Sequence, residues 1–519
     1  MSTPSFPEQA HKPSFLRDGM LLVLFIALVK FALHMFFNNR YGYFRDEFDY
    51  MACGQHLAWG FVDQPPMVPF LVQITRDVLG DSLRAIRFLP ALVSSAMVVL
   101  TAMIAREMGG KSYALFLSAL AAALAPMYLS NGGLLTTNFM EPLFWMGCAY
   151  FAILAVNRND PRYWLWFGVS AGLGLENKYS IGIFGLGIVV GLLLTNHRRT
   201  LWNKWLWIGG AAAFLIFLPN LTWNVQHQWP FLQLMHNIRA DGRDVQLSAW
   251  QYFSQQMLLI GFVSAPIWIT GVVGLFICKS LKPYRLLGWC YVVSFSAFVV
   301  LHGKNYYLAP IYPMLLAAGA VVIEHALNRS KQDWIWKPLI AGIVFAAGAC
   351  FAPITVPILP VESFLVYLDK LPFKIPRSEK SHFGLALPQH YADQFGWEEI
   401  AVATAKIYNS LPPEQRAKTA IFGNNYGYAG AIDFFGPRYG LPKAIGGHQS
   451  YWLWGPRNYT GESLIVLGDH RATLEPKCAS IQEFDGHLNP YAVEQDPIFL
   501  CRGLKWNLQE IWPELKKWR

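Results

Sequence analysis

A cluster of acidic side chains follows the first long apolar run of the chain. The octapeptide YFRDEFDY, residues 43–50, holds Asp46, Glu47 and Asp49 beside Arg45. A carboxylate can take a proton from a hydroxyl group, so the cluster could supply a general base. The alternative is a solvated helix start, where acidic residues interact favourably with the helix dipole. Apolar and aromatic residues follow at helical spacing, which favours a position against other helices.

A second acidic candidate is Glu141, which is followed by Pro142 and lies at the start of a predicted membrane span, residues 139–156. An ionisable side chain at such a boundary is a functional candidate, because membrane segments tolerate few charges. Helix capping is the alternative interpretation.

Cations accompany these acids on the same predicted side of the membrane, namely Arg45, Lys178 and Lys304, with Arg239 or Arg243 as a further candidate. A lysine binds phosphate as a point charge, so both lysines are candidates for a phosphate site. The alternative is that they extend towards the lipid headgroups. Near Lys304 lie ring side chains on which a sugar could stack, or which line the membrane interface: His302, Tyr306, Tyr307 and Tyr312.

The composition indicates a membrane protein with many spans. Of 519 residues, 54% are hydrophobic and only 14% are charged, whereas soluble domains have about 25% charged residues. The formal charge of +9 could suggest nucleic acid binding. However, the basic residues form short clusters between apolar runs, as in membrane proteins, so we expect no nucleic acid partner.

Apolar runs predict an all-α bundle of about eleven membrane helices. They lie near residues 20–36, 87–105, 113–130, 139–156, 162–175, 180–196, 205–222, 256–278, 284–301, 306–323 and 338–357. Basic residues collect in alternate loops, at Lys12/Arg17, Arg106/Lys111, Arg158/Arg162, Arg198/Arg199/Lys204, Lys279/Lys282/Arg285 and Arg329/Lys331/Lys337. The positive-inside rule makes these loops and an N-terminal tail, residues 1–19, cytoplasmic.

The remaining loops are predicted to face outward. The first of them, residues 37–86, is predicted to contain a helix from residue 47 to 59 and an amphipathic helix ending near residue 79. The transmembrane part is predicted to span residues 20–357. After it the composition changes, and residues 358–519 predict a small extracytoplasmic α/β domain with strands near 420–422 and 463–467 and a helix near 397–411.

Cysteine placement agrees with an outward C-terminal domain. Cys478 and Cys501 both lie in it, and an oxidising compartment would permit a disulfide between them. Cys53 has no obvious partner. The chain has no Cys-x-x-Cys pair, so a thiolate zinc site is not expected.

Several motifs together resemble membrane glycosyltransferases of the GT-C fold. The similarity is greatest to the bacterial family-39-like branch, which is related to protein O-mannosyltransferases and to the aminoarabinose transferase that acts on lipid A. The motifs are Arg45-Asp-Glu47, Asp63-Gln-Pro-Pro66, Glu141-Pro-Leu143, Gly172–Lys178, Leu218–Asn224 and Tyr306–Pro313. Residues 424–430 and 447–456 resemble the C-terminal domain that such bacterial members often carry, to which we assign no chemistry.

The resemblance implies that a sugar moves from a polyprenyl phosphate carrier to a lipid, glycan or protein acceptor. The reaction would take place at the outer face of the bacterial cytoplasmic membrane. By motif position Asp46 would be the base, with inversion at the anomeric carbon, and Glu47 and Glu141 would assist. The cations would hold the phosphate, which is already a good leaving group. Asp49 is predicted to face water only.

Two departures from the family pattern matter. Gln64 stands where relatives often have a phosphate-binding lysine, and Glu141 stands where many have aspartate, with Asn138 as a competing alignment. No ligand set here demands a metal, so no cofactor is required. Some GT-C enzymes use a divalent metal, so a metal-dependent reaction stays open as an alternative. A flippase for a lipid-linked sugar is the alternative function. It predicts buried mid-span charges and inverted repeats, and the chain shows no repeat. A third hypothesis for the function is a non-enzymatic scaffold for envelope assembly.

Overall fold

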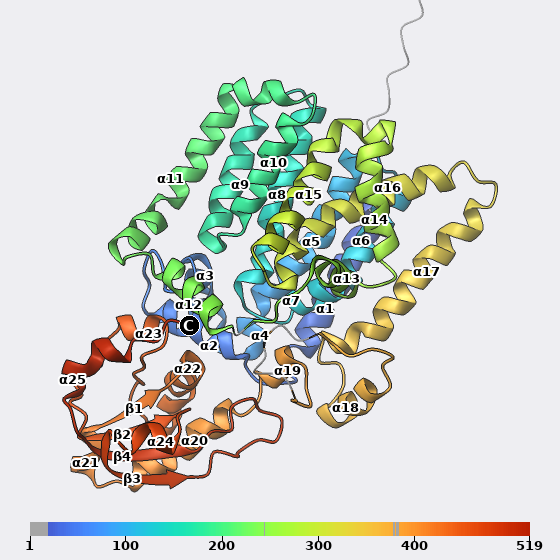
Figure 1. Ribbon diagram of the computed structural model, residues 1–519. Helices are drawn as coiled ribbons and strands as arrows, with labels where there is room; N and C mark the ends of the chain where they lie inside the picture. The colour runs from blue at the N-terminus through green and yellow to red at the C-terminus, as the bar shows by residue number, and fades with distance from the viewer. Residues whose placement is uncertain (1–18, 243, 377–378, 380–383) are drawn as a thin grey trace, which may run out of the picture.

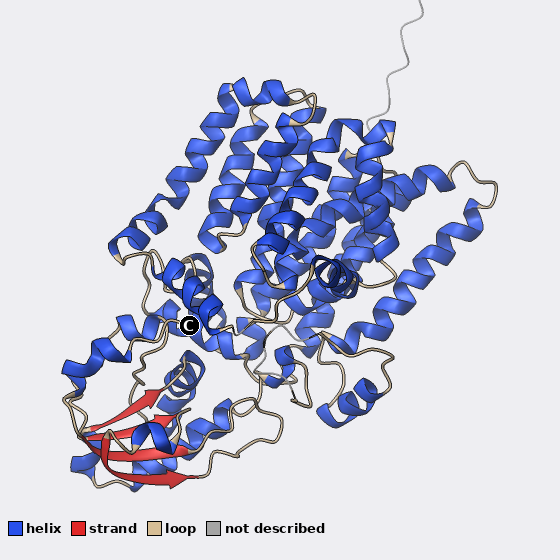
Figure 2. Ribbon diagram, viewed as in Figure 1, coloured by secondary structure: helices blue, strands red, loops and turns tan. Residues whose placement is uncertain are grey.

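The computed structural model describes residues 19–242, 244–376, 379 and 384–519. It has two parts, a large helical bundle and a smaller domain that contains a β-sheet (Figure 1, Figure 2). Most of the predicted tail, residues 1–19, lies outside the described residues, and so do Lys12, Arg17 and Arg243.

The chain enters the bundle through α1 (Met20–Phe37) and then forms three short helices. These are α2 (Arg45–Gln55), α3 (Met67–Leu79) and α4 (Leu83–Ile86). The two helices predicted within residues 37–86 are therefore present, and α2 begins two residues before the predicted start at residue 47 and ends four before the predicted end at 59.

Thirteen further helices complete the bundle among the described residues. They are α5 (Phe88–Glu107), α6 (Ser112–Leu124), α7 (Pro126–Asn131), α8 (Thr137–Asn157), α9 (Tyr163–Asn177), α10 (Ile181–Leu193), α11 (Lys204–Gln226), α12 (Pro230–Asp241), α13 (Ala249–Ile260), α14 (Ala265–Ile277), α15 (Arg285–Val300), α16 (Tyr312–Leu327) and α17 (Asp333–Phe351). Within the described chain, seven helices are long and apolar enough to cross a membrane, or eight with one bent pair. The expected total of about eleven spans stays a prediction.

Two predicted helices are interrupted. Residues 256–278 do not form one continuous helix, because the chain bends by 118° between α13 and α14. Gly261 at the break has a φ of 94°, a value that side chains with a Cβ rarely adopt. Pro266 follows, where a first-turn proline is accommodated in α14. In the same way Pro126 starts α7 and divides the predicted helix 113–130.

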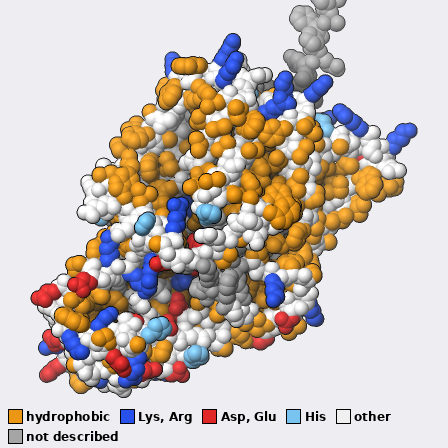
Figure 3. All heavy atoms as spheres, viewed as in Figure 1, with side chains coloured by type: hydrophobic (Ala, Val, Ile, Leu, Met, Phe, Trp, Pro, Cys, Tyr) orange, Lys and Arg blue, Asp and Glu red, His pale blue; other side chains and the backbone are white. Residues whose placement is uncertain are grey.

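The basic turns of the bundle lie together at one end. His197, after α10, contacts the carbonyl of Pro283, before α15, at 2.9 Å. The amide of Lys111 donates to Glu324 in α16 at 2.7 Å. In Figure 3, Lys and Arg side chains gather along the rim farthest from the sheet, above a broad hydrophobic surface. This arrangement agrees with a membrane-embedded bundle that has one basic end.

The C-terminal part contains a four-stranded mixed sheet in the order β1-β2-β4-β3. Its strands are β1 (Thr419–Gly423), β2 (Ser463–Leu467), β3 (Cys478–Phe484) and β4 (Ile498–Leu504). β1 and β2 are parallel, and the other two pairs are antiparallel. Both predicted strands, 420–422 and 463–467, are present.

Helices surround this sheet and connect it to the bundle. They are α18 (Val361–Asp369), α19 (Gln389–Ala392), α20 (Trp397–Ser410), α21 (Pro413–Ala417), α22 (Tyr426–Phe435), α23 (Ser450–Leu453), α24 (Arg471–Leu474) and α25 (Leu508–Ile511). The helix predicted near 397–411 is α20. A disulfide joins Cys478 in β3 to Cys501 in β4, the pair that the sequence suggested.

Candidate active site

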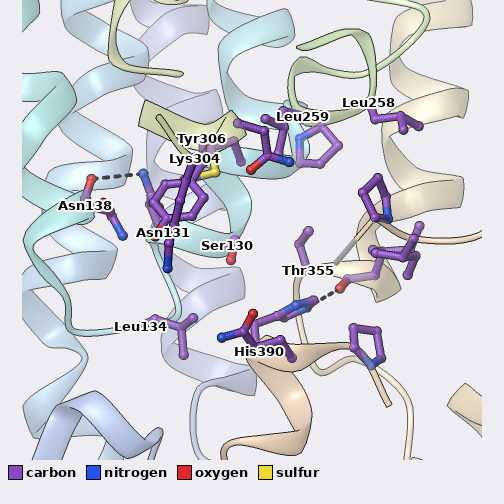
Figure 4. A pocket seen from close by; sticks show the side chains of 18 of the residues that line it. Ser130, Asn131, Leu134, Asn138, Leu258, Leu259, Lys304, Tyr306, Thr355 and His390 are labelled. Atoms are coloured by element: carbon purple, nitrogen blue, oxygen red, sulfur yellow. Dashed lines mark hydrogen bonds between the residues drawn. The ribbon is translucent and has the colours of Figure 1, made fainter. Parts of the chain in front are cut away.

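A cavity of about 380 Å³ lies where the bundle meets the C-terminal part. In Figure 4, Lys304 and Tyr306 reach into it from one wall, and His390 from the facing wall. Its polar lining comes from distant parts of the chain and includes Arg45, Asp46, Asn131, Asn138, Lys304, Tyr306, Glu379, Gln389, His390 and Tyr426. Leucine and phenylalanine side chains line much of the rest.

Asp46 lies in the first turn of α2 and lines this cavity. Its side chain is 32% exposed, and its Oδ1 lies 3.5 Å from Nε of Arg45. The same oxygen accepts a hydrogen bond of 2.6 Å from the hydroxyl group of Tyr426. Burial raises the pKa of Asp46, while Arg45 and Tyr426 oppose that rise. A carboxylate with a raised pKa is better suited to take a proton than an ordinary one.

Glu47, the neighbouring residue, is fully buried and saturated with donors. Nε and Nη2 of Arg87 each donate to it at 2.9 Å. The backbone amides of Phe44 and Leu135 donate to it as well, at 2.8 and 3.0 Å. This geometry favours a structural role, since no free acceptor site on the carboxylate faces the cavity. We predicted a supporting catalytic role for Glu47, and its contacts instead describe a clamp that fixes the start of α2.

Glu141 and Lys178 form an ion pair beside the cavity. The Lys178 Nζ lies 2.9 Å from Oε2 of Glu141 and donates to Oδ1 of Asn138 at 2.7 Å. The ring of Tyr307 lies 4.6 Å from this ammonium group. Among the described residues Asn138 lines the cavity and Glu141 does not. Both residues that competed for the second motif position therefore contact the same lysine.

Lys304 lines the cavity, and acidic groups hold its ammonium group. Nζ lies 2.7 Å from Oε1 of Glu379 and 3.5 Å from Oδ1 of Asp244. Tyr306 also lines the cavity.

The other three aromatic candidates do not line the cavity. Tyr307 lies beside Lys178. His302 is exposed in a turn with a φ of 52°, and it is not among the cavity-lining residues. Tyr312 is fully buried, and its ring packs at 5.0 Å from that of Trp268 in the hydrophobic core. The prediction that Tyr312 contributes to an accessible sugar-binding surface was wrong, because its ring is buried at the start of α16. The substrate-binding role of His302 stays a prediction.

The prediction for Asp49 was also wrong. Its side chain is buried rather than solvated, at 2% exposure. Gln64, which stands in place of the family lysine, donates to Asp49 Oδ2 at 3.0 Å. Burial raises the pKa of Asp49 well above its usual range and that of Asp63 to about 7. Burial therefore favours the protonated form of both carboxyl groups, and neither of them lines the cavity.

Sequence reasoning missed the contribution of residues after 370. Glu379, Gln389, His390 and Tyr426 all line the cavity. A signal existed for one of them, because Tyr426 lies in the Asn- and Tyr-rich stretch 424–430. No cluster of three or more His, Cys, Asp or Glu side chains that could hold a metal ion occurs among the residues that the structure describes.

Comparison with solved structures shows the fold class. The fold matches ArnT from Cupriavidus metallidurans bound to undecaprenyl phosphate with a TM-score of 0.61, at 14% identity, over 92% of this chain and 97% of that one. It matches the Archaeoglobus fulgidus oligosaccharyltransferase with a TM-score of 0.54, at 13% identity, over 82% and 62%. The chain therefore has the GT-C fold of membrane glycosyltransferases, as the motifs predicted.

Sequence comparisons add particular relatives. Residues 63–223 match the family model described as dolichyl-phosphate-mannose-protein mannosyltransferase. The lipid A galacturonosyltransferase RgtD from Rhizobium johnstonii is 27% identical over 218 residues. That match covers 41% of this chain and 44% of the relative, so it spans less than half of either protein.

Proposed function

We propose that the chain is a membrane glycosyltransferase that moves a sugar from a polyprenyl-phosphate-linked donor to an acceptor, with Asp46 as the general base. The observation that carries this proposal is the position of Asp46. Of the three acids singled out as catalytic, it alone lines the cavity, and it is partly exposed there. Glu47 and Glu141 are buried in ion pairs.

The cavity has the chemistry that a lipid-linked sugar requires. One part of its wall is apolar and suits an isoprenoid chain, with Leu258, Leu259, Phe262, Phe351 and Phe373. The other part carries the cations Arg45 and Lys304, which suit a phosphate group. The donor's phosphate would compete with Glu379 and Asp244 for Lys304.

The reaction follows from this placement as a single displacement. Asp46 accepts the proton of the acceptor hydroxyl group, whose oxygen attacks the anomeric carbon of the sugar. The bond from that carbon to the phosphate oxygen breaks, and polyprenyl phosphate leaves with the electron pair. One in-line attack inverts the configuration. Positive charge at Arg45 and Lys304 stabilises the charge that develops on the phosphate. No step requires a metal ion.

The basic turns support an outer-face location for the site. Helix α5 begins at the site, where Arg87 contacts Glu47, and ends at Glu107, beside the basic turns. By the positive-inside rule the basic end faces the cytoplasm, so the cavity and the C-terminal domain face outward. This orientation would make the N-terminus cytoplasmic in a bacterial inner membrane.

The comparisons support a lipid-linked donor and a lipid or glycan acceptor. One structural relative is described as bound to undecaprenyl phosphate, and one sequence relative as a lipid A galacturonosyltransferase. A lipid A-type acceptor is therefore the first to test, followed by other glycans and by protein.

The test is an assay of the purified full-length protein with polyprenyl-phosphate sugars and these acceptors, with and without a chelator. The Asp46→Asn variant is expected to lose about 10²–10⁴-fold in kcat while remaining folded. The matched control is Asp77→Asn, because Asp77 is an exposed acid on the neighbouring helix α3. Full activity of folded Asp46→Asn would remove Asp46 as the base. Loss of activity on chelation would add a metal to the mechanism.

The same preparation tests the flippase alternative. Reconstituted vesicles are loaded with lipid-linked sugar, and both its transbilayer movement and any glycosidic product are measured. Movement without product would replace the transferase with a flippase.

A further inference from the structure

We infer that the C-terminal domain completes the active site, and that its Tyr426 is a positioning residue for the proposed base Asp46. The inference rests on the proposed function and extends it to a domain without assigned chemistry. Tyr426 donates its hydroxyl proton to Oδ1 of Asp46 at 2.6 Å, across a sequence separation of 380 residues. It also lines the cavity, so the contact lies at the reacting carboxylate.

Tyr426 is held at a defined place by the start of its own helix. It is the first residue of α22, and the side chain of Asn425 caps that helix by accepting from the amide of Tyr428 at 3.0 Å. The amide of Tyr426 lies 3.3 Å from Nδ1 of His448. The ring of Tyr426 lies 5.7 Å from the guanidinium carbon of Arg45. Tyr426 therefore contacts both members of the Arg45–Asp46 pair.

Close packing of α22 on α2 fixes this geometry. A Cβ at Gly430 would lie 2.6 Å from Cβ of Phe48, and a Cβ at Gly427 would lie 2.7 Å from Cγ of Arg45. Neither position has room for a side chain. In addition, the amide of Arg45 donates to the carbonyl of Asp393 at 3.0 Å. The helix that carries the proposed base is thus packed directly against the C-terminal domain.

The hydrogen bond has a defined electrostatic effect. Burial holds the pKa of Tyr426 well above its usual value, so its hydroxyl group stays protonated and donates. A donor stabilises the charged form of Asp46 and lowers its pKa, against the rise caused by burial. Asp46 also interacts electrostatically with other charged or titratable groups. They are Arg45, Asp49, Tyr50, Asp63, Tyr306, Glu379 and Asp393.

Removing the hydroxyl group tests the inference. In Tyr426→Phe, we expect kcat at neutral pH to fall about tenfold, with the acidic limb of the pH profile about one pH unit higher. The KM of the donor should stay within about twofold, because the change acts on the base. The matched control is Tyr428→Phe, which removes from the same helix a hydroxyl group that donates to Asp496 at 3.4 Å.

A second measurement does not need activity. Water-soluble carbodiimide modifies protonated carboxyl groups, so mass spectrometry of Asp46 labelling across a pH series gives its midpoint directly. That midpoint should rise by about one pH unit in Tyr426→Phe and stay unchanged in Tyr428→Phe. Equal unfolding temperatures of the three proteins show that the fold is intact.

The outcomes separate the two proposals. A labelling midpoint and kcat that are both unchanged in Tyr426→Phe would overturn the positioning role while transfer by the wild type still stands. A shifted midpoint in a protein that transfers no sugar would keep the contact and remove the proposed function. A change of equal size in Tyr428→Phe would reduce the effect to general damage to the domain and also overturn the inference.

Discussion

Asp46 and Glu47 are adjacent in the sequence, yet they belong to two different environments. Glu47 has no exposed surface and accepts from Arg87 and from backbone amides. Asp46 retains 32% exposure and has a close hydroxyl donor and a guanidinium group 3.5 Å away. The difference shows how one helical turn supports a site, because the saturated acid fixes the backbone from which the unsaturated acid reaches the cavity.

Loss of Arg87, which removes the ion pair with Glu47, should have the largest effect on stability. In Arg87→Met, Glu47 remains buried without its ion partner, which should cost about 3–5 kcal/mol in the free energy of unfolding. Thermal unfolding of the purified protein in detergent measures this change. The double variant Glu47→Gln/Arg87→Met should recover part of the loss, since it leaves no buried charge.

Arg84 provides the control for the clamp. It lies one helical turn before Arg87, is exposed, and donates to the carbonyl of Met35 at 3.1 Å. Arg84→Met should change the free energy of unfolding by less than about 1 kcal/mol. If Arg87→Met were no more destabilising than Arg84→Met, the structural role of Glu47 would be contradicted, and the predicted catalytic role would again be the better hypothesis.

Lys304 and Lys178 also differ in whether they line the cavity or balance a buried acid, and we expect effects of intermediate size from their substitution. Lys304 lines the cavity, so Lys304→Met should raise the KM of the donor about tenfold through loss of a charged phosphate contact. Lys178 balances buried Glu141, so Lys178→Met should mainly lower the unfolding temperature. Steady-state kinetics and thermal unfolding of both variants distinguish these effects. An unchanged donor KM in Lys304→Met would place the phosphate contact elsewhere.

The smallest effect concerns the buried carboxyl group of Asp63. Because the pKa of Asp63 rises from its ordinary 3.8 to about 7 in the folded protein, the folded state binds more protons than the unfolded state between these values. Stability should therefore decrease as pH rises from 5 to 8. Asp63→Asn should flatten this dependence in unfolding temperatures measured at both pH values, and Asp77→Asn should not. Equal slopes in wild type and Asp63→Asn would contradict the raised pKa.

Much of the fold was readable because apolar runs and amphipathic spacing are local signals. The helix boundaries of α1, α8 and α11, the strands β1 and β2, and the change of composition near residue 358 all follow from such patterns. The bend at Gly261 was not predicted, because residues 256–278 form an apolar run that is long enough for one straight span. Only Gly261 and Pro266 within this run indicated a break.

The site was predictable only where it is local in sequence. Asp46 and Lys304 were found as charges at helix ends, and both line the cavity. The environment of Glu47 depends on Arg87, which is 40 residues away in the sequence. The burial of Asp49 depends on the loop that carries its partner Gln64. Tyr426 could not be assigned, because nothing local shows that a helix from the C-terminal domain packs on α2.

The separation of Asp46 from Tyr426 has a consequence for biogenesis. At 5–20 residues per second, the ribosome needs roughly 20–75 s to reach Tyr426 after it has made Asp46, 380 residues earlier. During that interval the membrane helices can insert while the carboxylate lacks its tyrosine partner. If the positioning role holds, a nascent chain in the membrane cannot turn over substrate at the full rate until the domain that carries Tyr426 has folded and docked.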